Sequence, residues 1–371
     1  MNFLKIFIVG YTHSKYDKRV FKTVKLLSKS NQVIYQYLTF DDEKVHKNGN
    51  IIFVPVTYKA KTKKYFGKTS TLINNFSSIK KFDRKIFDMI KTFDYDIIYF
   101  HYFLVSMPVK AFKVAKNKGK KVVYDLHEYH PENHFKNLKG LAKKVKEKLM
   151  WKVIKNQFFF SDKLIFVSEE ARNDMLNILK THKDSIVIPN YANIKLKSPE
   201  KIKEIVIVGK TPRNIQNERE ILKNLNKEGF SIKIVGIKTN ILNDIPCKYT
   251  DVLPYDKMMV EVSKSAFSLI SYKSFGQEYK NYIYSFPHKF FDSIAAGTPV
   301  IVNRSFVSMK NEVEKYGIGI VIEPQNVKES VRKILEAYKN YEKFLENIET
   351  YKDRYVWNKE KEEKFIKFIL D

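Results

Sequence analysis

Short apolar runs alternate with amphipathic stretches along most of the chain. Residues 3–9 and 97–100 are almost wholly apolar, as inner strands of a parallel sheet are, whereas residues 79–91 repeat their apolar side chains at helical spacing. Parallel neighbours in a sheet need a crossover segment between them, usually a helix. The pattern therefore predicts an α/β protein built from successive pairs of strand and helix.

The alternation stops at a polar, lysine-rich segment, residues 195–203, and then begins again. This restart predicts two doubly wound α/β domains joined by a short linker, an arrangement that leaves a cleft between the domains. The first domain is expected to contain strands at 3–9, 32–38, 51–56, 97–100, 121–124, 162–167 and 186–190, and the second domain strands at 205–208, 232–235, 267–271, 300–302 and 319–322.

The segment 286–303 combines a buried helix, a tight turn and a buried strand. Its apolar residues recur at helical spacing up to Gly297, a residue type that readily ends helices, and Val300 begins the strand. Two polar residues, Lys289 and Asp292, interrupt the apolar pattern. A helix N-terminus beside a parallel sheet attracts anions, and a carboxylate one turn later can accept hydrogen bonds from a ribose. The alternative is an ordinary helix and strand with two solvated polar side chains.

His101 and His127 each follow a predicted strand. In open α/β sheets, ligands bind at the carboxyl ends of the strands, and two successive strands bring these histidines to the same rim. A histidine there can bond a substrate hydroxyl or accept its proton. A single histidine at such a rim is usually a bystander, but two of them with carboxylates nearby favour a functional site.

Composition limits the class of protein. With 371 residues and 44% hydrophobic content, the chain can form two full cores and is not expected to be disordered. No run reaches the roughly 18 apolar residues of a membrane span, and the first ten residues lack the features of a signal peptide. The single Cys247 cannot form an intrachain disulfide. We therefore expect a cytoplasmic protein.

The chain is strongly basic, with 68 Lys and Arg against 41 Asp and Glu and a formal net charge of +27. This excess attracts nucleic acid, a phospholipid surface or phosphorylated substrates. The lysines are scattered and no nucleic-acid-binding module is recognisable, which argues against nucleic acid. Residues 58–68 place five lysines among three aromatic residues, a composition that suits an anionic membrane surface or, more commonly, a solvated loop. Neither a GxGxxG nor a Walker motif occurs.

Four motifs together resemble glycosyltransferase family 4. They are VVYDLHEYHPE at 122–132, SDKLIFVS at 161–168, VIPN at 187–190 and FPHKFFDSIAAGTPVI at 286–301, and their order and spacing match over nearly the whole chain.

This resemblance implies the GT-B fold, in which two Rossmann-like doubly wound domains face each other across a cleft that holds a nucleotide sugar. The final helix is expected to cross back onto the first domain. We therefore expect an acceptor-side domain at 1–195 that includes the helix at 353–371, and a nucleotide-sugar-binding domain at 196–352.

The resemblance also implies a donor site in the second domain. Asp292 stands where the family has a ribose-binding glutamate, and Tyr284 stands where the family has another glutamate, so the full pair is absent. After Gly209 the family has an Arg and a Lys for the diphosphate, for which Lys210, Arg213 and Arg219 are the candidates. The implied donor-binding residues are Lys210, Arg213, Pro287, Lys289, Asp292, Gly297, Thr298 and Pro299, and the segment formed by the last three is expected to place backbone N–H groups near the diphosphate.

On the first domain, His127 matches the histidine of the family's Asp-x-His-Glu motif, near the reacting sugar. Glu128 and His101 are expected beside it as further catalytic residues. The acceptor-side candidates are Gly10, Asp17 and Arg19. Neither a metal nor a cofactor is expected, because Lys, Arg and a helix N-terminus can neutralise the diphosphate.

The implied activity is transfer of a sugar, with retained configuration, from a nucleotide diphosphate to a lipid-linked or saccharide acceptor in surface polysaccharide biosynthesis. A UDP-sugar is the expected donor, and the expected location is cytoplasmic, at the inner face of the cell membrane. Two alternatives stay open: a nucleotide-sugar epimerase or hydrolase on the same fold, and a degenerate family member without catalytic activity.

Overall fold

The structure of the protein, a computed structural model, describes residues 3–58, 68–129, 132–135, 137–209, 215–272 and 279–371. The chain divides into two compact units. Unit 1 comprises residues 1–166, 172–187 and 362–371, and unit 2 comprises residues 167–171 and 188–361. The chain thus passes into unit 2 at residue 188 and returns at residue 362, whereas the sequence-based division places these changes at residues 196 and 353.

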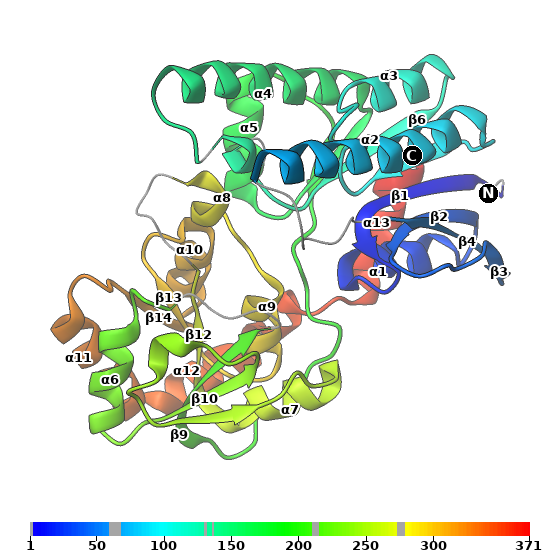
Figure 1. The fold of residues 1–371 in the computed structure, drawn as a ribbon. Helices are drawn as coiled ribbons and strands as arrows, with labels where there is room; N and C mark the ends of the chain where they lie inside the picture. The colour runs from blue at the N-terminus through cyan, green and yellow to red at the C-terminus, as the bar shows by residue number, and fades with distance from the viewer. Residues whose placement is uncertain (1–2, 59–67, 130–131, 136, 210–214, 273–278) are drawn as a thin grey trace. The chain divides into compact units, whose positions relative to one another are not determined.

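Unit 1 is built on an eight-stranded sheet in the order β3-β4-β2-β1-β5-β6-β7-β8 (Figure 1). Neighbouring strands are parallel, apart from β3, which pairs antiparallel with β4. The strands are β1 Lys5–Ser14, β2 Gln32–Thr39, β3 His46–Asn48, β4 Ile51–Thr57, β5 Ile97–Phe100, β6 Lys121–Leu126, β7 Lys163–Phe166 and β8 Ser185–Val187.

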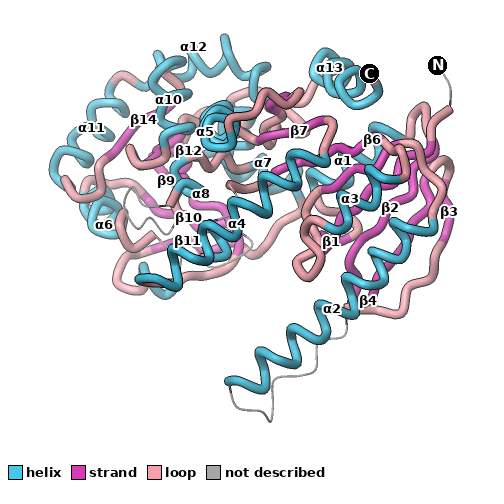
Figure 2. Tube along the Cα trace, turned by 90° about the horizontal axis from the view of Figure 1, so that it is seen from above, coloured by secondary structure: helices cyan, strands magenta, loops and turns pink. Residues whose placement is uncertain are grey.

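Helices cover both faces of this sheet (Figures 1 and 2). The C-terminal helix, α13, returns to unit 1: the Phe365 ring lies 6.4 Å from the Tyr99 ring, and the Leu370 carbonyl accepts a hydrogen bond of 2.8 Å from Lys121. This return is the one that the GT-B fold implies. The helices are α1 Lys18–Leu27, α2 Lys68–Thr92, α3 Lys110–Asn117, α4 Gly140–Phe160, α5 Glu169–Leu179 and α13 Lys359–Leu370, with a 3₁₀ turn at Glu132–His134.

Unit 2 contains a six-stranded parallel sheet in the order β11-β10-β9-β12-β13-β14. The strands β12 and β13 are buried along their whole length, because helices cover both faces of the sheet. The strands are β9 Ile202–Gly209, β10 Ser231–Gly236, β11 Cys247–Thr250, β12 Ser265–Ile270, β13 Val300–Asn303 and β14 Gly319–Ile322.

Two hydrophobic clusters, one on each face, hold unit 2 together. Side chains of α6 and α11 pack on one face, and those of α7, α9 and α10 pack on the other. The helix α9 is the most deeply placed, since every residue from Phe290 to Ala295 is buried. The helices are α6 Arg219–Lys227, α7 Tyr255–Lys264, α8 Lys280–Ile283, α9 His288–Ala295, α10 Val307–Tyr316, α11 Val327–Lys339 and α12 Tyr341–Tyr351, with 3₁₀ turns at Asn240–Leu242 and Lys352–Tyr355.

Each sheet reverses its strand order once. In unit 1 the chain builds outward from β1 to β2 and β4 and then continues on the other side of β1 with β5; in unit 2 the same happens at β9 and β12. In open α/β sheets the crevice outside the carboxyl ends of the strands at such a switch point is where ligands bind. The topology therefore predicts one ligand site at the carboxyl ends of β1 and β5 and another at those of β9 and β12.

The structure corrects the interpretation of Gly10. This residue lies inside β1, which continues to Ser14, and not at the end of the strand. A Cβ atom at Gly10 would lie 2.7 Å from the carbonyl oxygen of Gln36, so the absent side chain lets β1 approach the neighbouring strand closely. The close approach that the sequence assigned to a ligand is made by the protein's own β2.

Two edge strands, β3 and β11, were not predicted. All three residues of β3 are exposed, and none of the four residues of β11 is fully buried. Such strands carry no apolar run, and the apolar run is the signal by which the inner strands are recognised.

Gly236 fixes how closely the carboxyl ends of β9 and β10 meet. Its φ is +129°, and a Cβ atom there would lie 1.9 Å from the carbonyl oxygen of Gly209. Gly229 offers a matched contrast, because its φ of +86° is also positive but the nearest atom to an added Cβ is the end of Lys203, at 3.5 Å.

We expect Gly236→Ala to lower the free energy of unfolding of unit 2 by about 3 kcal/mol or more, because backbone strain and steric overlap add. Gly229→Ala should cost about 1 kcal/mol, from strain alone. Urea unfolding is followed by tryptophan fluorescence in a Trp151→Phe background, which leaves Trp357 of unit 2 as the single tryptophan. Equal losses in the two variants would show that the contact with Gly209 is unimportant.

Candidate active site

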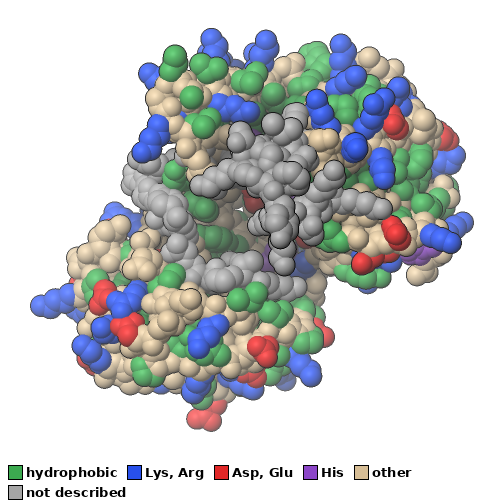
Figure 3. Space-filling model, viewed as in Figure 1, with side chains coloured by type: hydrophobic (Ala, Val, Ile, Leu, Met, Phe, Trp, Pro, Cys, Tyr) green, Lys and Arg blue, Asp and Glu red, His purple; other side chains and the backbone are tan. Residues whose placement is uncertain are grey.

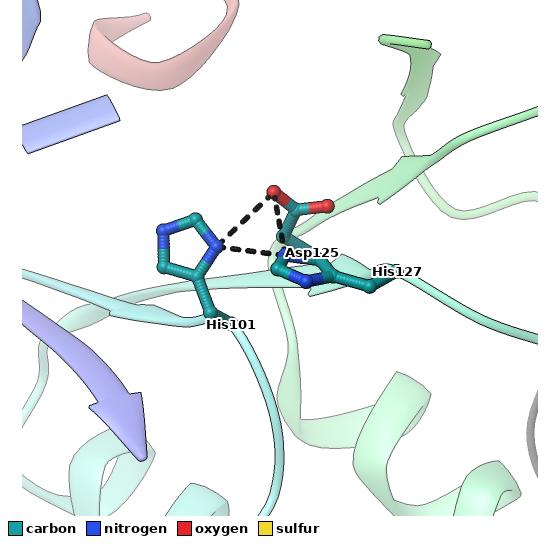
Figure 4. A group of neighbouring side chains, drawn as sticks. All are labelled: His101, Asp125 and His127. Atoms are coloured by element: carbon teal, nitrogen blue, oxygen red, sulfur yellow. Dashed lines mark hydrogen bonds and ion pairs between the residues drawn. The ribbon is translucent and has the colours of Figure 1, made fainter. Parts of the chain in front are cut away.

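A buried polar cluster lies at the switch point of unit 1. His101 directly follows β5, Asp125 is the fifth residue of β6, and His127 directly follows β6. The Nδ1 atom of His101 lies 2.9 Å from Nε2 of His127, and the Oδ2 atom of Asp125 lies 3.4 Å and 3.5 Å from these two nitrogens (Figure 4). His101 and Asp125 are buried, while the His127 side chain is 15% exposed. His127 is therefore the member that a substrate can reach.

Arg19 balances the charge of this cluster. Its guanidinium donates to both carboxylate oxygens of Asp125, from Nε at 3.2 Å and from Nη2 at 2.7 Å. Tyr99 donates a third hydrogen bond, of 2.9 Å, to Oδ2 of the same carboxylate. Arg19 reaches this position from the first turn of α1, whose N-terminus is capped by the Asp17 side chain through the backbone N–H groups of Arg19 and Val20. Two of the three predicted acceptor-side residues, Asp17 and Arg19, thus position and neutralise the cluster.

The pKa values of the cluster follow from burial and from Arg19. Burial raises the pKa of Asp125, but Arg19 and His127 outweigh burial and hold it well below its usual value. Burial lowers the pKa of His101 to about 3, against the weaker effect of Asp125, and burial also lowers the pKa of His127. Both histidines are therefore neutral near pH 7. One ring nitrogen donates to the other, and Asp125 is the ionised partner of Arg19.

Three side chains of the cluster are spaced as metal ligands are. His101, Asp125 and His127 offer ligand atoms that all lie within 4.8 Å of one another. Both oxygens of Asp125 already accept hydrogen bonds from Arg19, however, and the two histidine nitrogens face each other. A cation would have to displace these bonds beside a guanidinium, so the donor set fits a hydrogen-bonded network better than a metal centre.

Glu128 differs from its neighbours in the motif. It is exposed, and its charge acts on Tyr102, whose pKa is raised mainly by burial and further by Glu128. Glu128 is thus exposed, whereas His101 and Asp125 are buried.

In unit 2, polar side chains gather at the switch point between β9 and β12. Ser271 directly follows β12 and donates a hydrogen bond of 2.8 Å to the buried Glu218. Tyr272 comes next in the chain, and the ammonium group of Lys289 lies 5.4 Å from the centre of its ring. Lys289 is in the first turn of α9, which begins after Pro287. Of the predicted donor residues, Lys289 and Pro287 therefore lie at this edge of the sheet.

Asp292 lies deeper in the same helix. It is 5% exposed and accepts a hydrogen bond of 2.8 Å from the Tyr255 hydroxyl, which in turn accepts one of 3.0 Å from the backbone N–H of Asn193. Burial and Asp292 raise the pKa of Tyr255, so the phenol keeps its proton. Asp292 thus links α9 to the start of α7, a packing role that the sequence pattern did not indicate.

Gly297, Thr298 and Pro299 lie at the opposite end of α9, before the first residue of β13. The N–H of Gly297 donates to Ile294 and that of Thr298 to Ser293, each at 2.9 Å. The structure therefore does not bring these residues to the switch point, and the two N–H groups are not available to a diphosphate. The resemblance to family 4 implied that these residues meet the diphosphate, but the anion-attracting end of α9 is its N-terminus.

Two further candidates, Lys210 and Arg213, lie outside the described residues. The third, Arg219, forms ion pairs with Glu220 and Asp244. Sequence reasoning missed Glu218, Ser271 and Tyr99. The one available signal was the position of Ser271, which directly follows β12 as His101 follows β5.

The neutral, buried histidines make unit 1 sensitive to acid. His101 ordinarily titrates near pH 6.5 in an unfolded chain, but its pKa in the folded protein is about 3. Between about pH 6.5 and 3, His101 therefore binds a proton in the unfolded state but not in the folded state. Because of this difference, the free energy of unfolding falls as the pH is lowered through this range.

We expect His101→Gln to reduce this slope by up to about 1.4 kcal/mol per pH unit. His182→Gln, which replaces an exposed histidine of the same unit, should leave the slope unchanged. The measurement is urea unfolding between pH 4.5 and 7 in a Trp357→Phe background, with Trp151 reporting on unit 1. Identical slopes for wild type and His101→Gln would contradict the assignment of a neutral His101.

Comparison with known proteins agrees with this architecture. Residues 59–195 match the model of glycosyltransferase family 4, and residues 205–357 match that of the glucosyltransferase 3-like C-terminal domain. No curated protein sequence matches the chain.

Three solved structures illustrate the similarity of fold. Sucrose-phosphate synthase from Thermosynechococcus elongatus has 12% sequence identity, with 98% of this chain and 97% of that chain covered and a TM-score of 0.68. WaaG, a glycosyltransferase involved in lipopolysaccharide biosynthesis, has 11% identity, 98% and 99% coverage and a TM-score of 0.62. Anabaena HepE, in complex with UDP-glucose, has 12% identity, 95% coverage of each chain and a TM-score of 0.62. The chain therefore has the GT-B fold of these glycosyltransferases, with residues 59–195 matching the family 4 model and residues 205–357 matching the glucosyltransferase 3-like C-terminal model.

Proposed function

We propose that the protein transfers a sugar, with retained configuration, from a UDP-sugar to a lipid-linked or saccharide acceptor in surface polysaccharide biosynthesis. The observation on which this rests is the cluster of His101, Asp125 and His127 at the switch point of unit 1, within the region that matches family 4. His127 is neutral and partly exposed, and Arg19 balances the charge of Asp125 beside it. A histidine in this environment suits the binding of a sugar hydroxyl.

The donor binds at the switch point of unit 2 in this proposal. Lys289 is a half-buried cation beside Ser271 and Tyr272, at the edge of the sheet where α/β proteins bind ligands. The UDP and UDP-glucose complexes of HepE support a uridine nucleotide as the donor. We further propose that protein cations, rather than a metal ion, neutralise the diphosphate.

In the chemical step, the bond between the anomeric carbon and the diphosphate oxygen breaks, and the acceptor oxygen bonds to the same face of that carbon. The acceptor hydroxyl passes its proton to the departing diphosphate, whose developing charge Lys289 stabilises. Neutral His127 orients the reacting sugar or the acceptor. Its ring is held by His101 and Asp125, and Arg19 keeps the carboxylate ionised.

We also propose that unit 1 rests on an anionic membrane through α4. Leu141, Val145 and Leu149 follow at four-residue intervals, are 77%, 61% and 52% exposed, and so form one apolar stripe. Seven lysines and one glutamate occur between residues 139 and 155. In Figure 3, Lys and hydrophobic side chains lie together along the upper edge, where Figure 1 places α4. Apolar insertion and attraction to acidic lipids both favour this contact.

Within the described residues, every helix is too short or too polar to span a bilayer. The proposed attachment is therefore peripheral, with α4 lying along the surface. The other predicted membrane segment, residues 58–68, lies almost wholly outside the described residues.

A screen of UDP-sugars, with and without candidate acceptors and with EDTA present, tests the activity. Release of UDP that depends on the acceptor is expected. Release without an acceptor would favour the epimerase or hydrolase alternative, and no release with no nucleotide binding would favour a degenerate family member. Loss of activity in EDTA would contradict the metal-independent mechanism.

We expect Lys289→Ala to weaken UDP binding by about 10- to 100-fold, because a charge-assisted hydrogen bond contributes about 1.5–3 kcal/mol. Lys315→Ala is the matched control, since its ammonium group lies over the Tyr316 ring at 5.2 Å on another helix of unit 2. Isothermal titration calorimetry gives the affinities. Unchanged binding in Lys289→Ala would remove this residue from the site.

For the membrane proposal, we expect the protein to sediment with vesicles of phosphatidylcholine and phosphatidylglycerol but not with phosphatidylcholine alone, and to dissociate at high salt. Combined substitution of Leu141, Val145 and Leu149 by Ser should abolish most of this binding. Ile178→Ser, which changes an exposed apolar residue on α5, should not affect it. Retained binding of the triple variant would contradict a role for α4.

A further inference from the structure

One buried glutamate of unit 2 has no evident part in the fold. Glu218 directly precedes α6 and is 1% exposed, yet its side chain makes no capping hydrogen bond with that helix. Its Oε2 atom accepts the hydrogen bond from Ser271, while Oε1 has no hydrogen-bond partner among the described residues. Leaving a buried acceptor unfilled is unfavourable for folding. The unfilled oxygen is therefore more readily explained by a ligand than by the fold.

The surroundings of Glu218 place its carboxyl group at the ligand-binding edge of the sheet. Ser271 directly follows β12, and Asn303, which also acts on the carboxyl group, is the last residue of β13. Both residues thus lie at carboxyl ends of strands, next to the switch point between β9 and β12. Lys289, over the ring of Tyr272, belongs to the same edge.

A second buried glutamate shows what a structural carboxylate looks like in this sheet. Glu204, in the first half of β9, is also 1% exposed. Its Oε1 accepts a hydrogen bond of 2.8 Å from Ser265, and its Oε2 accepts bonds from Ser231 at 3.2 Å and Lys248 at 3.3 Å. Both carboxylate oxygens of Glu204 thus accept hydrogen bonds. A serine at the start of β12 bonds Glu204, and a serine directly after β12 bonds Glu218. Of these two glutamates, Glu218 alone keeps an oxygen that has no hydrogen-bond partner among the described residues.

We propose that Glu218 is a donor-binding residue whose Oε1 accepts a hydrogen bond from a hydroxyl group of the nucleotide sugar, on its ribose or its hexose. This inference rests on the proposed binding of a nucleotide sugar in unit 2. A carboxylate oxygen accepts but does not donate, and it repels phosphate, so a hydroxyl is the complementary group. Lys289, at the same edge, supplies the positive charge for the diphosphate.

The ionisation of Glu218 gives this proposal a distinctive readout. Burial raises its pKa to about 7, and the hydrogen bonds from Ser271 and Asn303 oppose this only partly. A hydroxyl donor favours the ionised form, so binding at pH 6 has to expel a proton from Glu218. Affinity should therefore increase from pH 6 to pH 8.

Other charged groups near Glu218 have partners of their own. Arg219 pairs with Glu220 and Asp244, and Arg304 pairs with Glu323. Lys201, whose pKa burial lowers to about 7, lies at the opposite edge of the sheet, where it donates to Ser263 and Thr298. Lys289 is present unchanged in every variant compared below. A pH effect that disappears with Glu218 can therefore be assigned to Glu218.

The experiment is calorimetric titration of the full chain with UDP and with UDP-glucose at pH 6 and pH 8, in buffers of different ionisation enthalpy. For wild type we expect about tenfold weaker binding at pH 6 than at pH 8 and release of a proton at pH 6. Glu218→Gln, an isosteric change, should bind the ligand about tenfold more weakly than wild type at pH 8. At pH 6 it should release fewer protons on binding than wild type. Because the terminal phosphate of UDP itself titrates near pH 6, the two proteins are compared at each pH.

Glu204→Gln is the control, and it should bind both ligands as wild type does once folding is verified by circular dichroism. An effect of Glu218→Gln on UDP assigns the hydroxyl to the ribose, and an effect on UDP-glucose alone assigns it to the hexose. Equal affinities of wild type and Glu218→Gln for both ligands, or proton uptake in place of release, would overturn the inference. If wild type binds neither ligand, the proposed function itself fails.

Discussion

The carboxylate of Asp125 is buried within the sheet of unit 1, and a buried charge is tolerated only beside a partner. Arg19 is that partner, and it comes from α1, more than a hundred residues earlier in the chain. Their ion pair ties the first helix to the sixth strand, while burial keeps both histidines neutral. The chemistry proposed for His127 thus depends on a charge balance that is made elsewhere in the sequence.

A second constraint is topological. A parallel sheet brings every strand's carboxyl end to one edge, and the reversal of strand order opens a crevice there. Both units obey this rule, with His101 and Asp125 at one switch point and Ser271 and Lys289 at the other. The fold therefore provides two polar sites by the same means, although the residues at the two sites share no sequence pattern.

The sequence was sufficient to predict the inner strands and the position of His101 and His127, because apolar runs and strand ends are local signals. It was insufficient for Glu218 and for the contacts of Asp292. Burial of Glu218 depends on Ser271, 53 residues away, and the partner of Asp292 is Tyr255 on another helix. Gly10 was expected on the acceptor side and Gly297 at the diphosphate, whereas a Cβ atom added to them would meet Gln36 and Ser198, respectively. A glycine signals that something lies close, but the sequence does not say whether a ligand or the protein's own backbone does.

The contrast between Glu204 and Glu218 has a consequence for the evolution of this chain. At the amino edge of the unit 2 sheet, a filled carboxylate is part of the fold, so substitutions there remove folded protein. At the carboxyl edge, a buried carboxylate oxygen without a hydrogen-bond partner destabilises the folded state. Substitutions there can therefore raise stability while they remove ligand binding. Stability and ligand binding therefore depend on opposite edges of the same sheet.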